Sequence, residues 1–304
     1  MSALSVIFSG AMLAQTVRMV VPYACAAVGG VLSERSGVVN IALEGTLLAS
    51  ALAGVAVDVA TGSPWAGLVA GAACGAIVGA LHAALVVRGR VDAIVSGIAL
   101  NLVCAGGTRF TLRALYGSSS NSPTIHGFRW GSGGLWSTLV DPCVLLALGA
   151  AALVTWGLTR TRRGLQVRAA GEDPAAARAV GIDVEATRLG AVALGGAITG
   201  LGGVALAFDL HQFQAGMSGG RGFIALAAVV VSGWRPGRAV AACVVFAALD
   251  ALQIVLQGQT KVPAQLVGVL PFVATLLALV VVARHGRGAF GGPPPAGLGK
   301  HGDV

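Results

Sequence analysis

The chain alternates long apolar segments with short polar turns. A membrane-spanning helix needs about 20 mostly apolar residues. Segments of that kind are predicted at 13–32, 41–60, 66–87, 91–113, 140–158, 187–207, 239–257 and 264–283. A shorter apolar segment at 222–234 fits a re-entrant or tilted half-helix. The pattern therefore predicts an all-helical polytopic membrane protein, with about nine (8–10) membrane segments in one domain over residues 1–290.

Composition supports a tightly packed bundle. Hydrophobic residues make up 56% of the chain and charged residues 11%, and the mean hydropathy is +0.83. A soluble domain carries about 25% charged residues. Glycine accounts for 46 of the 304 residues and recurs within the apolar segments. Because small residues let membrane helices approach closely, we expect the helices to pack against one another at short range.

Arginine placement predicts the orientation. If the spans alternate in direction, the arginines at 88–90, 160–188, 235–238 and 284–287 all fall on one side, which the positive-inside rule assigns to the cytoplasm. We therefore interpret the net charge of +8 as a topology signal and not as a nucleic-acid-binding surface. The Pro/Gly-rich residues 291–304 are expected to form a disordered cytoplasmic tail.

Short sequence motifs recur in two parts of the chain. Residues 29–31 and 41–43 read Gly-Gly-Val and Ile-Ala-Leu, and the same tripeptides recur at 202–204 and 224–226. Alternation gives the corresponding spans opposite directions. This indicates an inverted repeat, with four segments on each side of a lone span at 140–158.

The largest polar interruption is the stretch 160–188, which carries several arginines and carboxylates. Within it, Glu172 and Asp173 suit a helix N-terminus, Pro174 suits a first turn, and Gly181 suits a stop. One interpretation is a basic loop that only fixes topology. The other is a compact helical hairpin outside the lipid.

A second polar interruption lies within residues 32–45, Leu-Ser-Glu-Arg-Ser-Gly-Val-Val-Asn-Ile-Ala-Leu-Glu-Gly. Charges within a bilayer must face a cavity or pair internally. Asn40 and Glu44 are four residues apart and would share a helix face. The alternative is a cytoplasmic turn containing Glu34, Arg35 and Asn40, in which only Glu44 is buried.

The sequences of these two stretches resemble those of a known family. Residues 168–182 resemble the cytoplasmic coupling loop of ATP-driven importer permeases for sugars, nucleosides and branched-chain amino acids. Residues 29–45 resemble the signature of the nucleoside-type members, and 94–102, 220–228 and 250–257 match further blocks. The resemblance covers about residues 15–285. The chain departs from the family at Thr46–Leu48, where methionines are usual, and in the polar outer loop 117–134.

The resemblance implies that the chain works together with other subunits. A second related permease, an ATP-binding subunit with two nucleotide-binding domains, and an extracellular substrate-binding lipoprotein are the implied partners. The chain would bind no cofactor of its own, since ATP is bound by the partner. The residues implied to couple to that ATPase are Arg168, Gly171, Glu172, Pro174, Ala176, Gly181 and Ile182.

Buried polar side chains provide candidates for the substrate pathway. Amides and carboxylates suit the hydrogen-bonding edges of a nucleoside, and aromatic rings suit its face. The candidates are Asn40, Glu44, Asn101, Phe223, Asp250 and Gln253. Phe208 and Phe213 flank the short segment and are further stacking candidates, and Gln257 extends the polar stripe of Asp250 and Gln253. The alternative for each is a hydrogen bond that serves helix packing alone.

Catalytic motifs are not found. The sequence has no G-x-x-x-x-G-K-[ST] or HExxH motif, and its histidines and cysteines lack metal-ligand spacing. We therefore expect neither an enzyme nor a metal site. Apart from nucleosides, a simple sugar or a branched-chain amino acid remains a possible substrate, and an ion-coupled secondary transporter is the alternative from another class.

Overall fold

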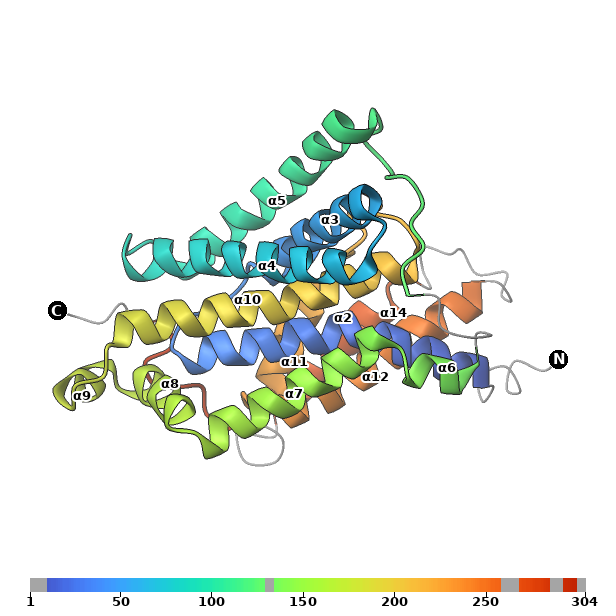
Figure 1. The fold of residues 1–304 in the computed structure, drawn as a ribbon. Coiled ribbons are helices and arrows are strands. Elements are labelled where there is room, and N and C mark those ends of the chain that lie inside the picture. The colour runs from blue at the N-terminus through green and yellow to red at the C-terminus, as the bar shows by residue number, and fades with distance from the viewer. Residues whose placement is uncertain (1–9, 129–133, 258–267, 285–291, 300–304) are drawn as a thin grey trace.

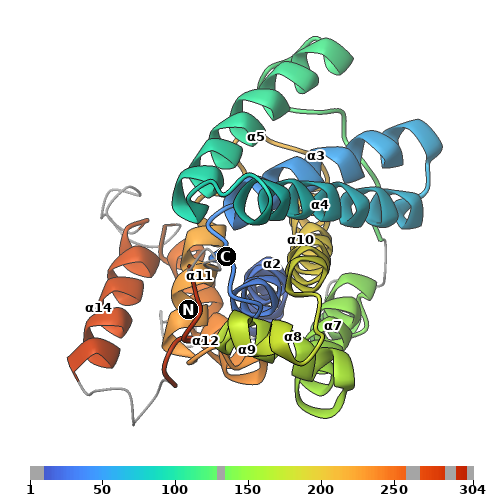
Figure 2. The same ribbon diagram turned by 90° about the vertical axis from the view of Figure 1, so that its left-hand side faces the viewer.

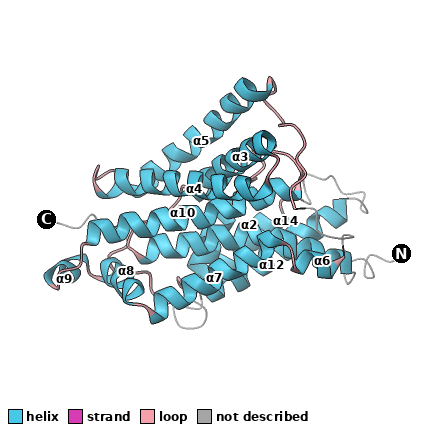
Figure 3. Cartoon of the chain, in the orientation of Figure 1, coloured by secondary structure: helices cyan, strands magenta, loops and turns pink. Residues whose placement is uncertain are grey.

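The computed structural model describes residues 10–128, 134–257, 268–284 and 292–299. In these ranges the chain is helical apart from turns, loops and one isolated bridge between Asn121 and Gln214 (Figure 3). The helices are α2 (Gly10–Arg35), α3 (Leu43–Thr61), α4 (Pro64–Val87), α5 (Ala93–Tyr116), α6 (Leu135–Leu139), α7 (Pro142–Arg160), α8 (Arg162–Glu172), α9 (Pro174–Ala179), α10 (Val184–Asp209), α11 (Arg221–Val231), α12 (Pro236–Gln257) and α14 (Leu270–Arg284).

The predicted polytopic membrane fold is confirmed. Seven helices among the described residues are long and apolar enough to cross a membrane: α2, α3, α4, α5, α7, α10 and α12. Two shorter apolar helices, over Arg221–Val231 and Pro271–Val281, correspond to the predicted segments at 222–234 and 264–283. Residues 264–267 of the latter lie outside the described ranges. The predicted total of about nine segments is therefore an approximate count.

Helices α2 and α10 form the centre of the bundle and run antiparallel (Figure 1). Arg18 near the start of α2 lies 3.7 Å from Asp209 at the end of α10. At the other end, Arg188 near the start of α10 donates from Nε to the Ser36 carbonyl at 3.0 Å. A Cβ on Gly29 would lie 2.3 Å from the Gly195 carbonyl oxygen, so only glycine permits this approach. The expectation that small residues mediate helix packing holds here.

The helices on either side of α7 follow corresponding orders. The first half contains α2, α3, α4 and α5, and the second contains α10, α11, α12 and α14. Both halves begin with a helix of 26 residues. Helix α4 packs on α10 and α12 packs on α2. In each half, one helix therefore packs on the first helix of the other half (Figure 2). This exchange is the arrangement that an inverted repeat predicts.

Two of the arginine-rich stretches, 88–90 and 160–188, lie at one end of the bundle (Figure 1). Arg88, after α4, pairs with Glu185 in the first turn of α10. Arg35, at the end of α2, lies 3.6 Å from Glu172 at the end of α8. The stretches 88–90 and 160–188 therefore share one side, as the alternation of spans predicts.

Part of the C-terminal tail differs from the sequence expectation. Disorder was expected over 291–304, yet the described residues 292–299 lie against the bundle. The Gly297 amide donates to the Gly171 carbonyl at 2.8 Å, and the Gly299 amide donates to the Gly37 carbonyl at 3.1 Å. The Ala296 amide donates to the Glu172 carboxylate at 3.1 Å. These contacts depend on surfaces far away in sequence, so the composition of the tail carried no signal for them.

Candidate functional site

The stretch 160–188, called the coupling loop from here on, forms the helical hairpin that the sequence predicted. Asp173 caps α9 by accepting hydrogen bonds from the amides of Ala175 and Ala176, each at 3.0 Å. Pro174 occupies the first turn of α9, and Gly181 follows the helix with φ +84°. One detail was wrong. Glu172 does not begin α9 but is the last residue of α8.

The seven predicted coupling residues divide by exposure. Glu172, Ala176 and Gly181 are exposed, whereas Arg168, Pro174 and Ile182 are half-buried and Gly171 is buried. A Cβ on Gly171 would lie 2.2 Å from the Arg35 carbonyl oxygen. Gly171 therefore sits inside the contact between the coupling loop and α2, and not on a free surface. Val180 was not among the predicted coupling residues. It is 76% exposed, and an apolar residue in this otherwise polar hairpin was an available signal for a contact surface.

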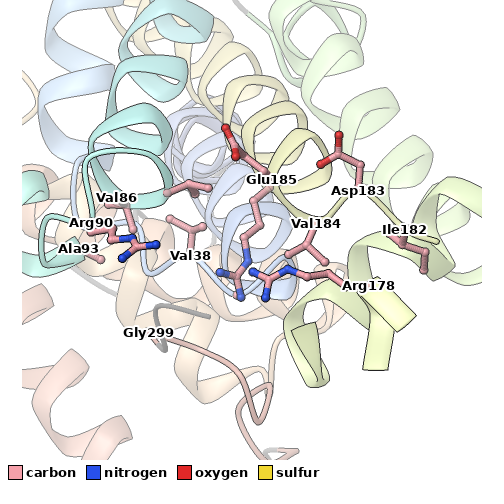
Figure 4. Close-up of a pocket in the computed structure, with 13 residues that line it drawn as sticks. Val38, Val86, Arg90, Ala93, Arg178, Ile182, Asp183, Val184, Glu185 and Gly299 are labelled. Atoms are coloured by element: carbon pink, nitrogen blue, oxygen red, sulfur yellow. The ribbon is translucent and has the colours of Figure 1, made fainter. Parts of the chain in front are cut away.

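A pocket opens beside the coupling loop at the same end of the bundle (Figure 4). Its volume is about 570 Å³. Arg90 and Arg178 enter it from opposite sides, and Asp183 and Glu185 border it. The lining therefore carries charges of both signs. Such a pocket does not follow from sequence, because it joins the turn after α4, the start of α10 and the tail.

The α2–α3 connection buries polar groups that the alternative interpretation placed in a cytoplasmic turn. Glu34 and Asn40 are each 2% exposed, whereas Glu44 is only half-buried. The alternative in which only Glu44 is buried is therefore wrong. Asn40 donates from Nδ2 to the Ser33 hydroxyl at 3.1 Å and accepts from the Ala42 amide at 3.2 Å. Its side chain thus holds the turn itself.

Glu44 joins the N-termini of α3 and α11. Its two carboxylate oxygens accept from the amides of Gly220 and Gly222, each at 2.8 Å. The free amides and the dipole at a helix N-terminus favour a carboxylate there. A Cβ on Gly222 would lie 2.4 Å from the Glu44 amide nitrogen, which explains glycine at that position.

Asp250 has the internal partner that a carboxylate in this setting needs. Its Oδ2 lies 2.9 Å from Nη2 of Arg221, and the Tyr23 hydroxyl donates to the same oxygen at 3.2 Å. The Arg221 guanidinium also lies 5.9 Å from the Tyr23 ring centroid. Arg221 was not among the predicted site residues. An arginine within the apolar run 220–228 was the available signal, since such a charge must be paired or reach water.

The remaining candidates differ in their contacts and in their burial. Asn101 accepts from the Gly45 amide at 2.8 Å and donates to the Ile41 carbonyl at 2.9 Å, so it ties α5 to the start of α3. Phe223 is 49% exposed and Gln253 is half-buried. Phe208 and Phe213 are buried in the core, which places both rings in packing positions. The side chain of Gln257 lies outside the described residues.

The structure thus brings three of the six pathway candidates, Glu44, Phe223 and Asp250, to the N-terminal end of α11. Glu44 binds its first amides, Asp250 pairs with its first residue, and Phe223 is exposed in its first turn. Each hydrogen bond also serves packing. The geometry therefore defines a polar cluster within the bundle at this end of α11.

Comparisons with known proteins identify the class. The family model described as "Branched-chain amino acid transport system / permease component" matches residues 12–279. A putative glucose ABC transporter permease of Haloferax volcanii is 36% identical over 299 residues, covering 91% of this chain and 88% of its own length.

Two further relatives are nucleoside permeases by name. A guanosine ABC transporter permease of Bacillus subtilis is 33% identical, covering 85% of this chain and 87% of its own length. A nucleoside ABC transporter permease of Lactococcus lactis is 31% identical, covering 86% of this chain and 88% of its own length. These relatives are transport components, and their family associates with ATP-binding and substrate-binding components. The chain therefore belongs to the family of branched-chain amino acid transport system permease components and is a multi-pass protein of the cell membrane.

Proposed function

We propose that this chain is the membrane permease of an ATP-driven importer of nucleosides. The observation that carries the proposal is sequence similarity to two nucleoside permeases, whose alignments cover 86% and 85% of this chain. The polar cluster at the start of α11 supports it, because a nucleoside offers several hydrogen-bonding edges and one aromatic face. Asn40, Glu44, Asn101, Phe223, Asp250 and Gln253 remain the candidates for lining or shaping the pathway.

Energy enters through the coupling loop in this proposal. The exposed side of α9 and its C-terminal end presents Ala176 and Val180, at the end of the bundle that the arginine clusters assign to the cytoplasm. An ATP-binding subunit with two nucleotide-binding domains would dock there, and the charged pocket beside the loop would receive part of it. The chain itself needs no cofactor, because ATP belongs to that subunit. A second permease subunit and an external substrate-binding lipoprotein would complete the assembly.

A simple sugar is the second candidate substrate, since the glucose permease relative is 36% identical to this chain. The two substrates differ in chemistry. A nucleoside carries an aromatic base that can stack, whereas a sugar presents hydroxyl groups all round. Phe223, which is 49% exposed beside the polar cluster, favours the nucleoside.

Uptake competition tests the proposal. Cells that lack the gene for this chain would be supplied with the wild-type chain and given radiolabelled guanosine, with unlabelled nucleosides, glucose or leucine as competitors. We expect the wild-type chain to restore guanosine uptake and nucleosides alone to compete. A wild-type chain that restores uptake of radiolabelled glucose or leucine but not of guanosine would replace the proposed substrate.

A further inference from the structure

One short segment, Glu34–Glu44, contacts both ends of α11. At the C-terminal end, the Trp234 indole Nε1 donates to the Glu34 carboxylate, and Arg35 Nε donates to the Trp234 carbonyl at 3.0 Å. At the N-terminal end, Glu44 accepts from Gly220 and Gly222. We call Glu34–Glu44 the linking segment. Because it binds the start of α11 and the turn that follows its end, α11 cannot shift alone without breaking these hydrogen bonds.

The same segment contacts the coupling loop. Arg35 lies 3.6 Å from Glu172, and its carbonyl oxygen packs directly on Gly171. Arg188 donates from Nε to the Ser36 carbonyl at 3.0 Å and from Nη2 to the Ala170 carbonyl at 3.2 Å. Arg35 therefore has the coupling loop on one side and the turn after α11 on the other.

The interior of the linking segment is held firmly. The Asn40 amide donates to the Glu34 carboxylate, and the Asn40 side chain bonds Ser33 and Ala42. His82 Nε2 lies 2.9 Å from the Val39 carbonyl, and its Nδ1 lies 3.0 Å from the Ser96 hydroxyl. Both His82 and Asn40 are buried. A displacement applied at Arg35 is thus passed on, because the turn has few free torsions to absorb it.

We propose that the linking segment carries movement of the coupling loop to α11, with Glu34 and Arg35 as positioning residues. This inference rests on the proposed function, which supplies the movement. Helix α11 is a suitable receiver, since its first turn holds Arg221 against Asp250 and exposes Phe223. Moving α11 therefore changes the polar cluster itself.

Distance measurements between spin labels follow the movement of the coupling loop and the movement of α11 separately. In the complex with its ATP-binding subunit, reconstituted in lipid, a reference label replaces the exposed Val69 on α4. The second label replaces either Arg178 on α9 or Val230 on α11, in a chain whose five free cysteines have been substituted. Nucleotide-free samples are compared with samples that hold a non-hydrolysable ATP analogue.

In the wild-type chain we expect both label pairs to shift on nucleotide binding. In Arg35→Gln and Glu34→Leu, the 178–69 distance should still shift while the 230–69 distance stays fixed. Transport per ATP hydrolysed should fall about 10-fold, the range typical of site-to-site coupling. The control Asp209→Asn removes the Arg18–Asp209 ion pair at the opposite end of the bundle and should leave both shifts intact.

A second variant protects the test against misfolding. Trp234→Phe keeps an aromatic ring but removes the indole N–H that donates to Glu34 and part of the ring system. It should reduce the 230–69 shift with a modest loss of stability from the smaller ring. A full 230–69 shift in all three variants would overturn the inference. A wild-type chain whose 178–69 distance does not respond to nucleotide would instead overturn the proposed ATP coupling, and the inference with it.

Discussion

The guanidinium of Arg221 and the carboxylate of Asp250 form an ion pair of 2.9 Å between the first turn of α11 and the middle of α12. Their side chains are only 17% and 12% exposed. Removing one partner of a buried pair leaves the other charge uncompensated, which costs far more than the pair itself contributes.

Asp250→Asn should therefore lower stability by about 3 kcal/mol, measured as a lower thermal unfolding midpoint in detergent. Adding Arg221→Met should restore most of the loss, because the amide still accepts from Tyr23 and no charge remains unpaired. The matched control is Asp209→Asn, whose partner Arg18 is 39% exposed, so the loss should stay below about 1 kcal/mol. Unchanged stability in Asp250→Asn, with an altered preference among nucleosides, would assign Asp250 to the pathway instead.

Close contact between α2 and α10 predicts a second outcome. Gly29→Ala would place a Cβ 2.3 Å from the Gly195 carbonyl oxygen, so the helices must separate. We expect a loss of about 2 kcal/mol in the same unfolding assay. Gly190→Ala, also on α10, meets nothing within 4 Å and should be neutral or stabilising by up to about 1 kcal/mol. Equal effects of the two substitutions would contradict the close packing.

The exposed Val180 at the end of α9 predicts a third outcome. If the ATP-binding subunit buries this side chain, Val180→Asp should weaken their association about 10-fold, as loss of an interface anchor does. The affinity can be measured by titrating the purified ATP-binding subunit onto the permease in nanodiscs. Val59→Asp introduces the same charge at a 39% exposed site in the last turn of α3 and should leave the affinity unchanged. Normal affinity in Val180→Asp would remove Val180 from the docking surface.

The tail contact predicts a fourth outcome. A Cβ on Gly297 would lie 2.8 Å from the Gly171 carbonyl oxygen and 3.1 Å from Pro174 Cδ. Gly297→Val should detach this part of the tail, and amide hydrogen exchange at residues 297 and 299 should accelerate about 10-fold, the effect of losing one backbone hydrogen bond each. Ala296→Val adds the same side chain at an exposed neighbour and should leave the exchange rates as they are. Fast exchange in the wild-type chain would contradict the contact.

The helices could be predicted because bilayer thickness fixes the length of an apolar span, and caps such as Asp173 act within a few residues. Pairings between distant segments could not be predicted in the same way. Arg221 was passed over because its partner Asp250 lies on another helix, and Glu34 looked like a surface charge until the contact with Trp234 buried it. Which side a polar residue faces depends on helix rotation, and the apolar pattern of a buried membrane helix specifies that rotation only weakly.

The most direct measurement is guanosine uptake into proteoliposomes that contain the permease complex and the substrate-binding lipoprotein, with ATP or an ion gradient as the only energy source. The account predicts uptake with ATP when the ATP-binding subunit is present, and none with a proton or sodium gradient alone. Uptake driven by an ion gradient in the absence of the ATP-binding subunit would show a secondary transporter and would contradict the account.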